Sequence, residues 1–192
     1  MNKLRAETKT IKNDLEYLRQ VSKEVNFDID DWKEVLNKLD EFCKNDDNIR
    51  AIASIQLGIP LRLIYLKNTE VDKTDEPEYN ESSVLINPVI IKREGLTKYW
   101  EACASCLDNT GLVERPYKVE IEYYDENKIK HNEIFEGFES TVLSHEMDHL
   151  DGILHIDKSL ELYEMNKEVR KEFRKTHPYT VIRKDGEFIE NK

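Results

Sequence analysis

Five consecutive residues, His145-Glu146-Met147-Asp148-His149, have the types and spacing needed for metal-dependent hydrolysis. On an α-helix, residues four apart lie on one face, so His145 and His149 can bind one ion while Glu146 projects beside them. A divalent ion lowers the pKa of a bound water from about 15.7 to about 7, and a neighbouring carboxylate can act as general base. The pattern therefore predicts a metal-dependent hydrolase. The alternative is a solvated helix, since 36% of the residues are charged.

Two stretches of the chain could supply a third metal ligand. Downstream, Gly152 and then His155 follow His149 at intervals of three residues, as in the long pattern of metzincin-type zinc proteases. Upstream, Cys103 could supply a thiolate and complete a Cys, His, His site with an open fourth position. Cys106 lies three residues after Cys103, so a closed structural zinc site with two cysteines and two histidines is a further alternative.

The chain resembles the peptide deformylases, a family marked by three motifs that occur here in the same order. The stretch IRAIASIQ at 49–56 is similar to the glycine-rich first motif, EACAS at 101–105 is similar to EGCLS, and HEMDH at 145–149 fits the third motif. With shorter likenesses between them, the resemblance covers about residues 10–160. The family usually has Phe at the position of His155, so the resemblance favours Cys103 as the third ligand.

The resemblance implies an enzyme that removes the formyl group from the N-terminal formyl-methionine of nascent peptides and releases formate. It implies one divalent metal ion per chain, bound by Cys103, His145 and His149, with Fe(II) as the physiological ion and zinc, nickel or cobalt able to replace it. Glu146 would be the general base, while the side-chain amide of Gln56 and the backbone N–H of Ala104 would stabilise the oxyanion. The residues expected to contact the substrate are Arg50, Ala51, Glu101, Phe138 and Val142.

The first motif departs from the family pattern. Both glycines are replaced, by Ile49 and Ala51, and Arg50 stands where a small apolar residue is usual. Glycine permits close approach of a substrate backbone, so the added side chains are expected to narrow or reshape the cleft. Arg50 would favour an acidic or carboxylate-bearing ligand. A non-catalytic protein that binds formyl-methionyl peptides is therefore a second hypothesis, and a metzincin-like endopeptidase that uses His155 is a third.

Length and charge narrow the class of protein further. The 192 residues suit one domain with a substantial core. A net charge of -11 argues against binding to DNA or to anionic membranes, which attract clustered Lys and Arg. No apolar run approaches the roughly 20 residues that span a bilayer, and the first 25 residues show no apolar core of a signal peptide. We therefore expect a cytoplasmic protein, in which a reducing environment leaves Cys103 free to bind metal.

The hydrophobic pattern predicts one α+β domain of mainly antiparallel strands around a central metal-binding helix. Apolar residues at helical spacing predict a helix over 31–43 and another from about Ser140, which carries the histidines. Short apolar runs predict strands, and the polar stretch 67–82 predicts a loop. The four predicted strands are 61–66, 84–91, 117–124 and 129–138.

The C-terminal part is expected to add one helix to a catalytic domain that spans residues 1–175. The helix is predicted at about 160–175, and a polar tail follows at 176–192. In some deformylases the C-terminal helix contacts ribosomal RNA. Here this helix could do the same or form a solvated face, because it concentrates five basic residues, Lys167, Arg170, Lys171, Arg174 and Lys175.

Overall fold

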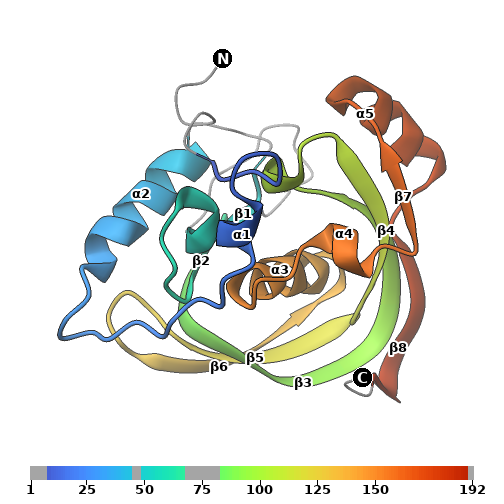
Figure 1. Cartoon of the computed structure of the whole chain (residues 1–192). Coiled ribbons are helices and arrows are strands. Elements are labelled where there is room, and N and C mark those ends of the chain that lie inside the picture. Colours follow the sequence, from blue (N-terminus) through green and yellow to red (C-terminus); the bar gives the residue numbers. More distant parts are fainter. Residues whose placement is uncertain (1–7, 45–48, 68–82, 190–192) are drawn as a thin grey trace.

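The computed structural model describes residues 8–44, 49–67 and 83–189 (Figure 1). Helices and strands alternate irregularly along the chain, as expected for an α+β fold. No helix in these three ranges is long and apolar enough to cross a bilayer. In chain order the elements are α1 (Leu15–Leu18), α2 (Trp32–Lys44), β1 (Ala51–Ala53), η2 (Ser54–Leu57), β2 (Leu63–Leu66), β3 (Ser83–Ala102), η3 (Ala104–Cys106), β4 (Asn109–Arg115), β5 (Lys118–Tyr124), β6 (Lys130–Glu136), α3 (Gly137–Leu150), α4 (His155–Lys158), β7 (Glu161–Glu164), α5 (Lys167–Thr176) and β8 (Thr180–Phe188).

One long strand, β3, organises the sheet. It pairs with β2, β4, β5 and β8, and all of these pairs are antiparallel. β1 extends the sheet beyond β2, β7 extends it beyond β4, and β6 pairs with β5. Figure 1 shows β3 curving past α3, which lies inside the bend of the sheet. The predicted single α+β domain with antiparallel strands is confirmed.

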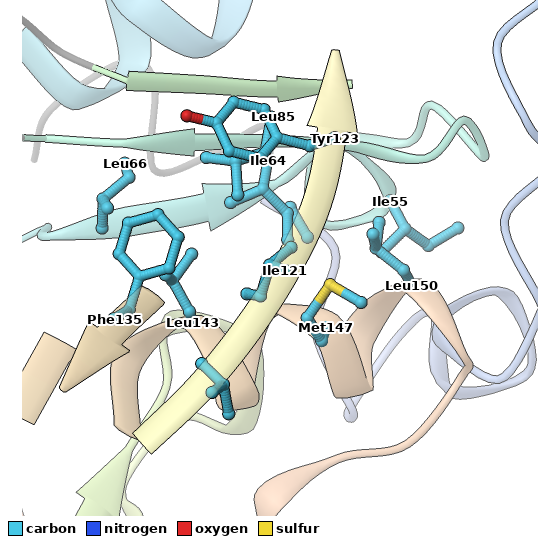
Figure 2. Packing of buried hydrophobic residues seen from close by; sticks show 12 residues of the cluster. Ile55, Ile64, Leu66, Leu85, Ile121, Tyr123, Phe135, Leu143, Met147 and Leu150 are labelled. Atoms are coloured by element: carbon cyan, nitrogen blue, oxygen red, sulfur yellow. The ribbon is translucent and has the colours of Figure 1, made fainter. Parts of the chain in front are cut away.

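The apolar side of α3 packs into the concave face of this sheet (Figure 2). Leu143, Met147 and Leu150 recur at intervals of four and three residues, so they lie on one helical face. They contact inward-facing strand residues such as Ile121 of β5, where buried and less buried side chains alternate as the sequence predicts. The same packing directs the neighbouring residues His145, Glu146 and His149 to the other side of the helix.

A second cluster covers the β1–β2 end of the sheet. Helix α2 buries Trp32, Val35, Leu39 and Phe42 against it, so the helix predicted over 31–43 is confirmed. Its spacing of three and four residues fixes one apolar face, and the exposed face carries the charged residues.

The largest differences from the sequence-based expectations lie near the C-terminus. Residues 161–164, expected in a helix, instead form β7, because their backbone pairs with the exposed edge of β4. The helix begins only at Lys167, where Asn166 Oδ1 accepts the N–H of Val169 at 3.0 Å. The expected polar tail contains β8, which pairs with β3 although its side chains are exposed.

Other strands also differ in extent or were not predicted. β3 continues to Ala102 rather than ending near residue 91, since it exchanges one set of neighbours for another along its length. β1 is too short for a pattern of alternation, and β4 has buried residues in consecutive positions, so neither has a clear period of two.

Candidate metal centre and substrate cleft

Helix α3 presents two imidazoles and one carboxylate to the same region. The Nε2 atoms of His145 and His149, one turn apart, lie 3.2 Å from each other. His149 is fully buried and Glu146 is also buried. The two imidazoles, which the sequence spacing predicted to lie on one helical face, therefore meet in the structure.

Cys103 approaches the same point from the end of β3. It follows the last residue of the strand and precedes η3 in extended backbone, which turns its side chain towards α3. Its Sγ lies 3.2 Å from His149 Nε2, and the ligand atoms of Cys103, His145 and His149 all lie within 4.8 Å of one another.

The three donors suit a divalent metal ion. A tetrahedral zinc ion with bonds of about 2.0–2.1 Å to nitrogen and about 2.3 Å to sulfur separates its ligand atoms by about 3.3–3.6 Å. The separations of 3.2 Å between the two Nε2 atoms and between His149 Nε2 and Cys103 Sγ are close to those values. A hydrogen bond from Cys106 and the nearby His149 hold the pKa of Cys103 below its usual range, which favours the thiolate that a metal needs.

Neither alternative ligand belongs to this group. Within the described residues, the group of converging donors contains Cys103 but neither His155 nor Cys106. A hydrogen bond to Cys103, together with burial, raises the pKa of Cys106, so this residue remains a thiol. The arrangement thus favours a three-ligand site over the metzincin-type site and over the closed four-ligand zinc site.

A buried ion-pair network fixes the orientation of His145. Its Nδ1 lies 2.7 Å from Glu101 Oε2, so its Nε2 faces the ligand group. Arg115 donates to both oxygens of Glu101, at 2.8 and 2.9 Å, and also pairs with Asp148. Burial favours the neutral form of Glu101, but Arg115 outweighs it and holds the pKa of that carboxyl below its usual range. Asp148 accepts a further hydrogen bond from Lys158 at 2.7 Å, so it belongs to the network rather than to an unpaired helix surface.

Arg115 was not recognised from the sequence. Val113 and Arg115 are two residues apart in β4, so both point to the same buried side of the strand. A charged residue at an inward-facing strand position would have indicated a buried ion pair. This position can be recognised in the sequence only if β4 is first recognised as a strand.

The Arg115 network predicts a large loss of stability when its cation is removed. Arg115→Gln should lower the free energy of unfolding by about 3–5 kcal/mol, because it leaves the buried carboxylate of Glu101 without its guanidinium partner. Arg62→Gln is the matched control. Its pair with the half-exposed Asp151 should contribute no more than about 1 kcal/mol. Urea denaturation measures both variants, and equal losses would contradict a special role for the buried network.

His155 lies beside the site as a buried, unpaired imidazole. Its ring stacks on that of His145 with centroids 5.7 Å apart, and neither of its nitrogens has a hydrogen-bond partner among the described residues. Burial lowers the pKa of His155 to about 4 from its ordinary 6.5. Between about pH 4 and pH 6.5, His155 is therefore neutral in the folded protein and protonated in the unfolded chain.

This shift predicts a loss of stability in mild acid. The unfolded state binds a proton below about pH 6.5 while the folded state stays neutral until about pH 4, so stability falls across that window. The expected loss is about 2 kcal/mol by pH 5. His155→Phe should remove this difference between pH 7.5 and pH 5 in urea denaturation, whereas Ile156→Val, a neighbouring apolar substitution, should keep it. An unchanged pH dependence in His155→Phe would contradict the assignment.

Gln56 and Glu146 lie beside the three donors. Gln56 is buried, its Oε1 accepts the N–H of Ala53 at 3.0 Å, and its Nε2 lies 3.3 Å from Cys103 Sγ and 3.2 Å from Ser105 Oγ. Burial raises the pKa of Glu146, and its Oε2 has no hydrogen-bond partner within the described part of the chain.

A cavity of about 210 Å³ opens onto this group. The residues expected from the sequence to contact a substrate all line its wall, together with Gln56, Ala104 and Glu146. Tyr99 and Arg174 line it as well, and neither was expected at the cavity from the sequence, because β3 and α5 meet only in the folded chain. The five expected residues are Arg50, Ala51, Glu101, Phe138 and Val142.

Comparisons with known proteins agree with the motifs. The family model described as polypeptide deformylase matches residues 8–165. A peptide deformylase from Leptospira biflexa is 33% identical over 163 residues, which are 79% of this chain and 88% of that protein. One from Pelagibacter ubique is 36% identical over 141 residues, which are 73% of this chain and 78% of that protein.

Solved structures of such proteins have the same fold. A probable peptide deformylase from Synechococcus phage S-SSM7 is 29% identical, with a TM-score of 0.68 over 79% of this chain and 97% of that chain. A peptide deformylase from Synechococcus elongatus, solved in complex with actinonin, is 28% identical, with a TM-score of 0.68 over 88% of this chain and 86% of that chain. The chain therefore belongs to the peptide deformylase family, the hydrolases that remove the formyl group from the N-terminus of nascent peptides.

Proposed function

We propose that this chain cleaves formyl-methionyl peptides in the cavity beside Cys103, His145 and His149, with Glu146 as the proton carrier. The observation that carries the proposal is the convergence of different groups on one cavity. Three side chains of metal-binding type meet there, next to a buried carboxylate with an unpartnered oxygen and a buried amide. Each group has a separate task in amide hydrolysis, as follows.

The metal ligands of the proposal are Cys103, His145 and His149. A divalent ion bound there supplies a Lewis acid and lowers the pKa of its water to about 7. A thiolate with two imidazoles suits ferrous iron as well as zinc, and softness alone does not choose between them. From the family resemblance we propose Fe(II) as the physiological ion, with zinc, nickel or cobalt able to replace it.

Glu146 has the position and the environment of a proton carrier. Its carboxylate lines the cavity next to the two histidines, where it takes a proton from the attacking water and later gives that proton to the leaving amine nitrogen. Because burial raises its pKa, the carboxyl group holds the proton between these two steps more readily than an exposed glutamate would.

Gln56 and Ala104 are the proposed donors to the oxyanion of the tetrahedral intermediate. The hydrogen bond from the Ala53 N–H to Oε1 fixes the Gln56 amide so that its N–H groups face Cys103. The backbone N–H of Ala104 follows directly after that cysteine. One donor of this kind contributes about 10²–10³ in rate, and the alanine side chain does not affect its N–H.

Release of formate from formyl-Met-Ala tests this function directly. Protein purified without oxygen, with its metal content measured, should release formate in proportion to bound metal. Protein that is replete with metal and binds the peptide but releases no formate would instead support the binding-only hypothesis. The cavity retains about 210 Å³ although Ile49, Arg50 and Ala51 line it, so these side chains do not close it to a peptide.

We further propose that the exposed basic face of α5 contacts ribosomal RNA. Not all of the basic residues of α5 are available for this contact. Arg174 is turned towards β3, and Lys175 pairs with Glu172 at 2.8 Å. Lys167 and Lys171 remain exposed.

The ribosome proposal predicts an effect of charge at these two lysines. Substituting Glu for both Lys167 and Lys171 should weaken co-sedimentation with ribosomes and make it less dependent on salt. The same change at Lys12 and Lys33 is the control, because it alters the net charge equally at a distance from α5. Equal co-sedimentation of the two double variants would refute the contact.

A further inference from the structure

Helix α5 brings a cation to the wall of the catalytic cavity. Arg174 lines the same cavity as Cys103 and Glu146. Its Nε donates to the carbonyl oxygen of Trp100 at 2.9 Å, and its guanidinium carbon lies 4.7 Å from the centroid of the Tyr99 ring. This residue lies beyond residues 8–165, the part of the chain that the family model matches.

Aromatic packing holds α5 in this position. The ring of Phe173, next to Arg174, packs edge-on against the indole of Trp100, with centroids 4.9 Å apart. Tyr163 stacks on the same indole at 5.3 Å. Tyr99, below the guanidinium group, packs edge-on against Phe138 at the start of α3, with centroids 5.1 Å apart. The cation is therefore fixed relative to the strand and the helix that carry the catalytic groups.

The charge of Arg174 is not neutralised locally. No carboxylate in the described ranges forms an ion pair with it, and both of its hydrogen bonds go to one backbone carbonyl. The only carboxylates that line the cavity within these ranges are Glu101 and Glu146. Glu101 is already paired with Arg115 and His145. An anionic group that enters this part of the cavity would thus meet a preorganised donor.

We propose that Arg174 selects substrates that carry a carboxylate shortly after the formyl-methionine. The inference rests on the proposed hydrolysis at Cys103, His145 and His149. Trp100 precedes Cys103 by three residues of extended chain, about 10 Å at roughly 3.3 Å per residue. An extended peptide with its formyl group at Cys103 spans the same distance with its first three residues. The carboxylate therefore belongs to the second or third residue, either as an Asp or Glu side chain or as the C-terminus of a very short peptide.

Peptides with amidated C-termini separate these two sources. kcat/KM is compared for formyl-Met-Ala-Asp amide, formyl-Met-Asp-Ala amide, formyl-Met-Ala-Ala amide and formyl-Met-Ala-Lys amide, with formyl-Met-Ala-Ala free acid as an additional substrate. We expect at least one aspartate peptide to exceed the lysine peptide about tenfold, as one charge-assisted contact allows. The ratio should shrink as salt rises. A preference only for the free acid would assign the contact to the C-terminal carboxylate.

Substitutions on α5 assign the preference to one residue. Arg174→Gln should bring the ratio of aspartate to lysine peptide close to one, and Arg174→Lys should retain part of it, because it keeps the charge. Arg170→Gln removes the same charge one turn earlier on the helix, from a residue that does not line the cavity, and should keep the ratio. A preference that persists in Arg174→Gln, or that disappears only in Arg50→Gln, would overturn the proposal.

The affinity for deformylated products can be measured whether or not the chain hydrolyses formyl peptides, so it tests Arg174 independently of the proposed catalysis. Calorimetry compares Met-Ala-Asp amide with Met-Ala-Lys amide on the wild type and on Arg174→Gln. If no formate is released, the proposed hydrolysis is wrong. The role of Arg174 would still be supported if the wild type binds the aspartate peptide more tightly than the lysine peptide and Arg174→Gln does not. If formate is released from all peptides at similar rates, the hydrolysis stands and the role of Arg174 is excluded.

Discussion

Glu146→Ala should retain its metal and lose nearly all formate release. The substitution removes the proposed proton carrier but none of the three proposed ligands, so kcat should fall by at least about 10²–10⁴, the usual contribution of general acid–base catalysis. Formate release from formyl-Met-Ala and metal content per chain are measured on the same preparation.

The same change elsewhere on α3 provides the control. Glu139 is an exposed carboxylate on this helix and does not line the cavity, so Glu139→Ala should keep most of the activity. A metal-replete Glu146→Ala protein that still turns over at a rate near wild type would remove Glu146 from the mechanism. Loss of metal in that variant would instead show that the carboxylate holds the site together.

Cys103→Ala should lose metal, whereas His155→Phe should keep it. Loss of an outer partner of a metal ligand already costs about 10–100-fold in affinity, so loss of a direct ligand should exceed that range. Metal per chain is measured by atomic emission after dialysis against a chelator. Metal that is retained in Cys103→Ala but lost in His155→Phe, together with cleavage of an internal peptide bond in casein, would support the metzincin-like hypothesis with His155 as ligand.

The sequence predicts the elements whose hydrophobic period is clear. α2, α3 and β5 each carry a repeated apolar spacing, and α2 and β5 lie within one residue of their predicted ranges. α3 begins at Gly137, three residues before the predicted start and inside the strand predicted at 129–138. β7 and β8 could not be predicted in this way, because their side chains are exposed and the backbone pairing that makes them strands comes from β4 and β3.

The residues of the site likewise differ in how well the sequence predicts them. The pair His145 and His149 is local, since one helical turn brings the two rings together. Cys103 lies 46 residues before His149, and only the resemblance of its surrounding motif marked it in the sequence. Arg115 and Arg174 have no motif. Their roles follow from which strand edge and which helix face the folded chain brings to the cavity, and this information is spread over more than 70 residues.

The pairing of β3 also determines when the protein can fold during synthesis. β3 needs β2 from earlier in the chain, but its other partners, β4, β5 and β8, are made after it, the last of them near residue 188. The pairing with β8 has a high sequence separation, since Glu94 pairs with Phe188, and non-local pairings of strands typically form in milliseconds to seconds. At about 5–20 residues per second, the ribosome needs several seconds to complete the segment from β3 to β8. The part of β3 that pairs with β8 therefore remains without this partner until residues 180–188 have been made, although β2, β4 and β5 are available to β3 much earlier.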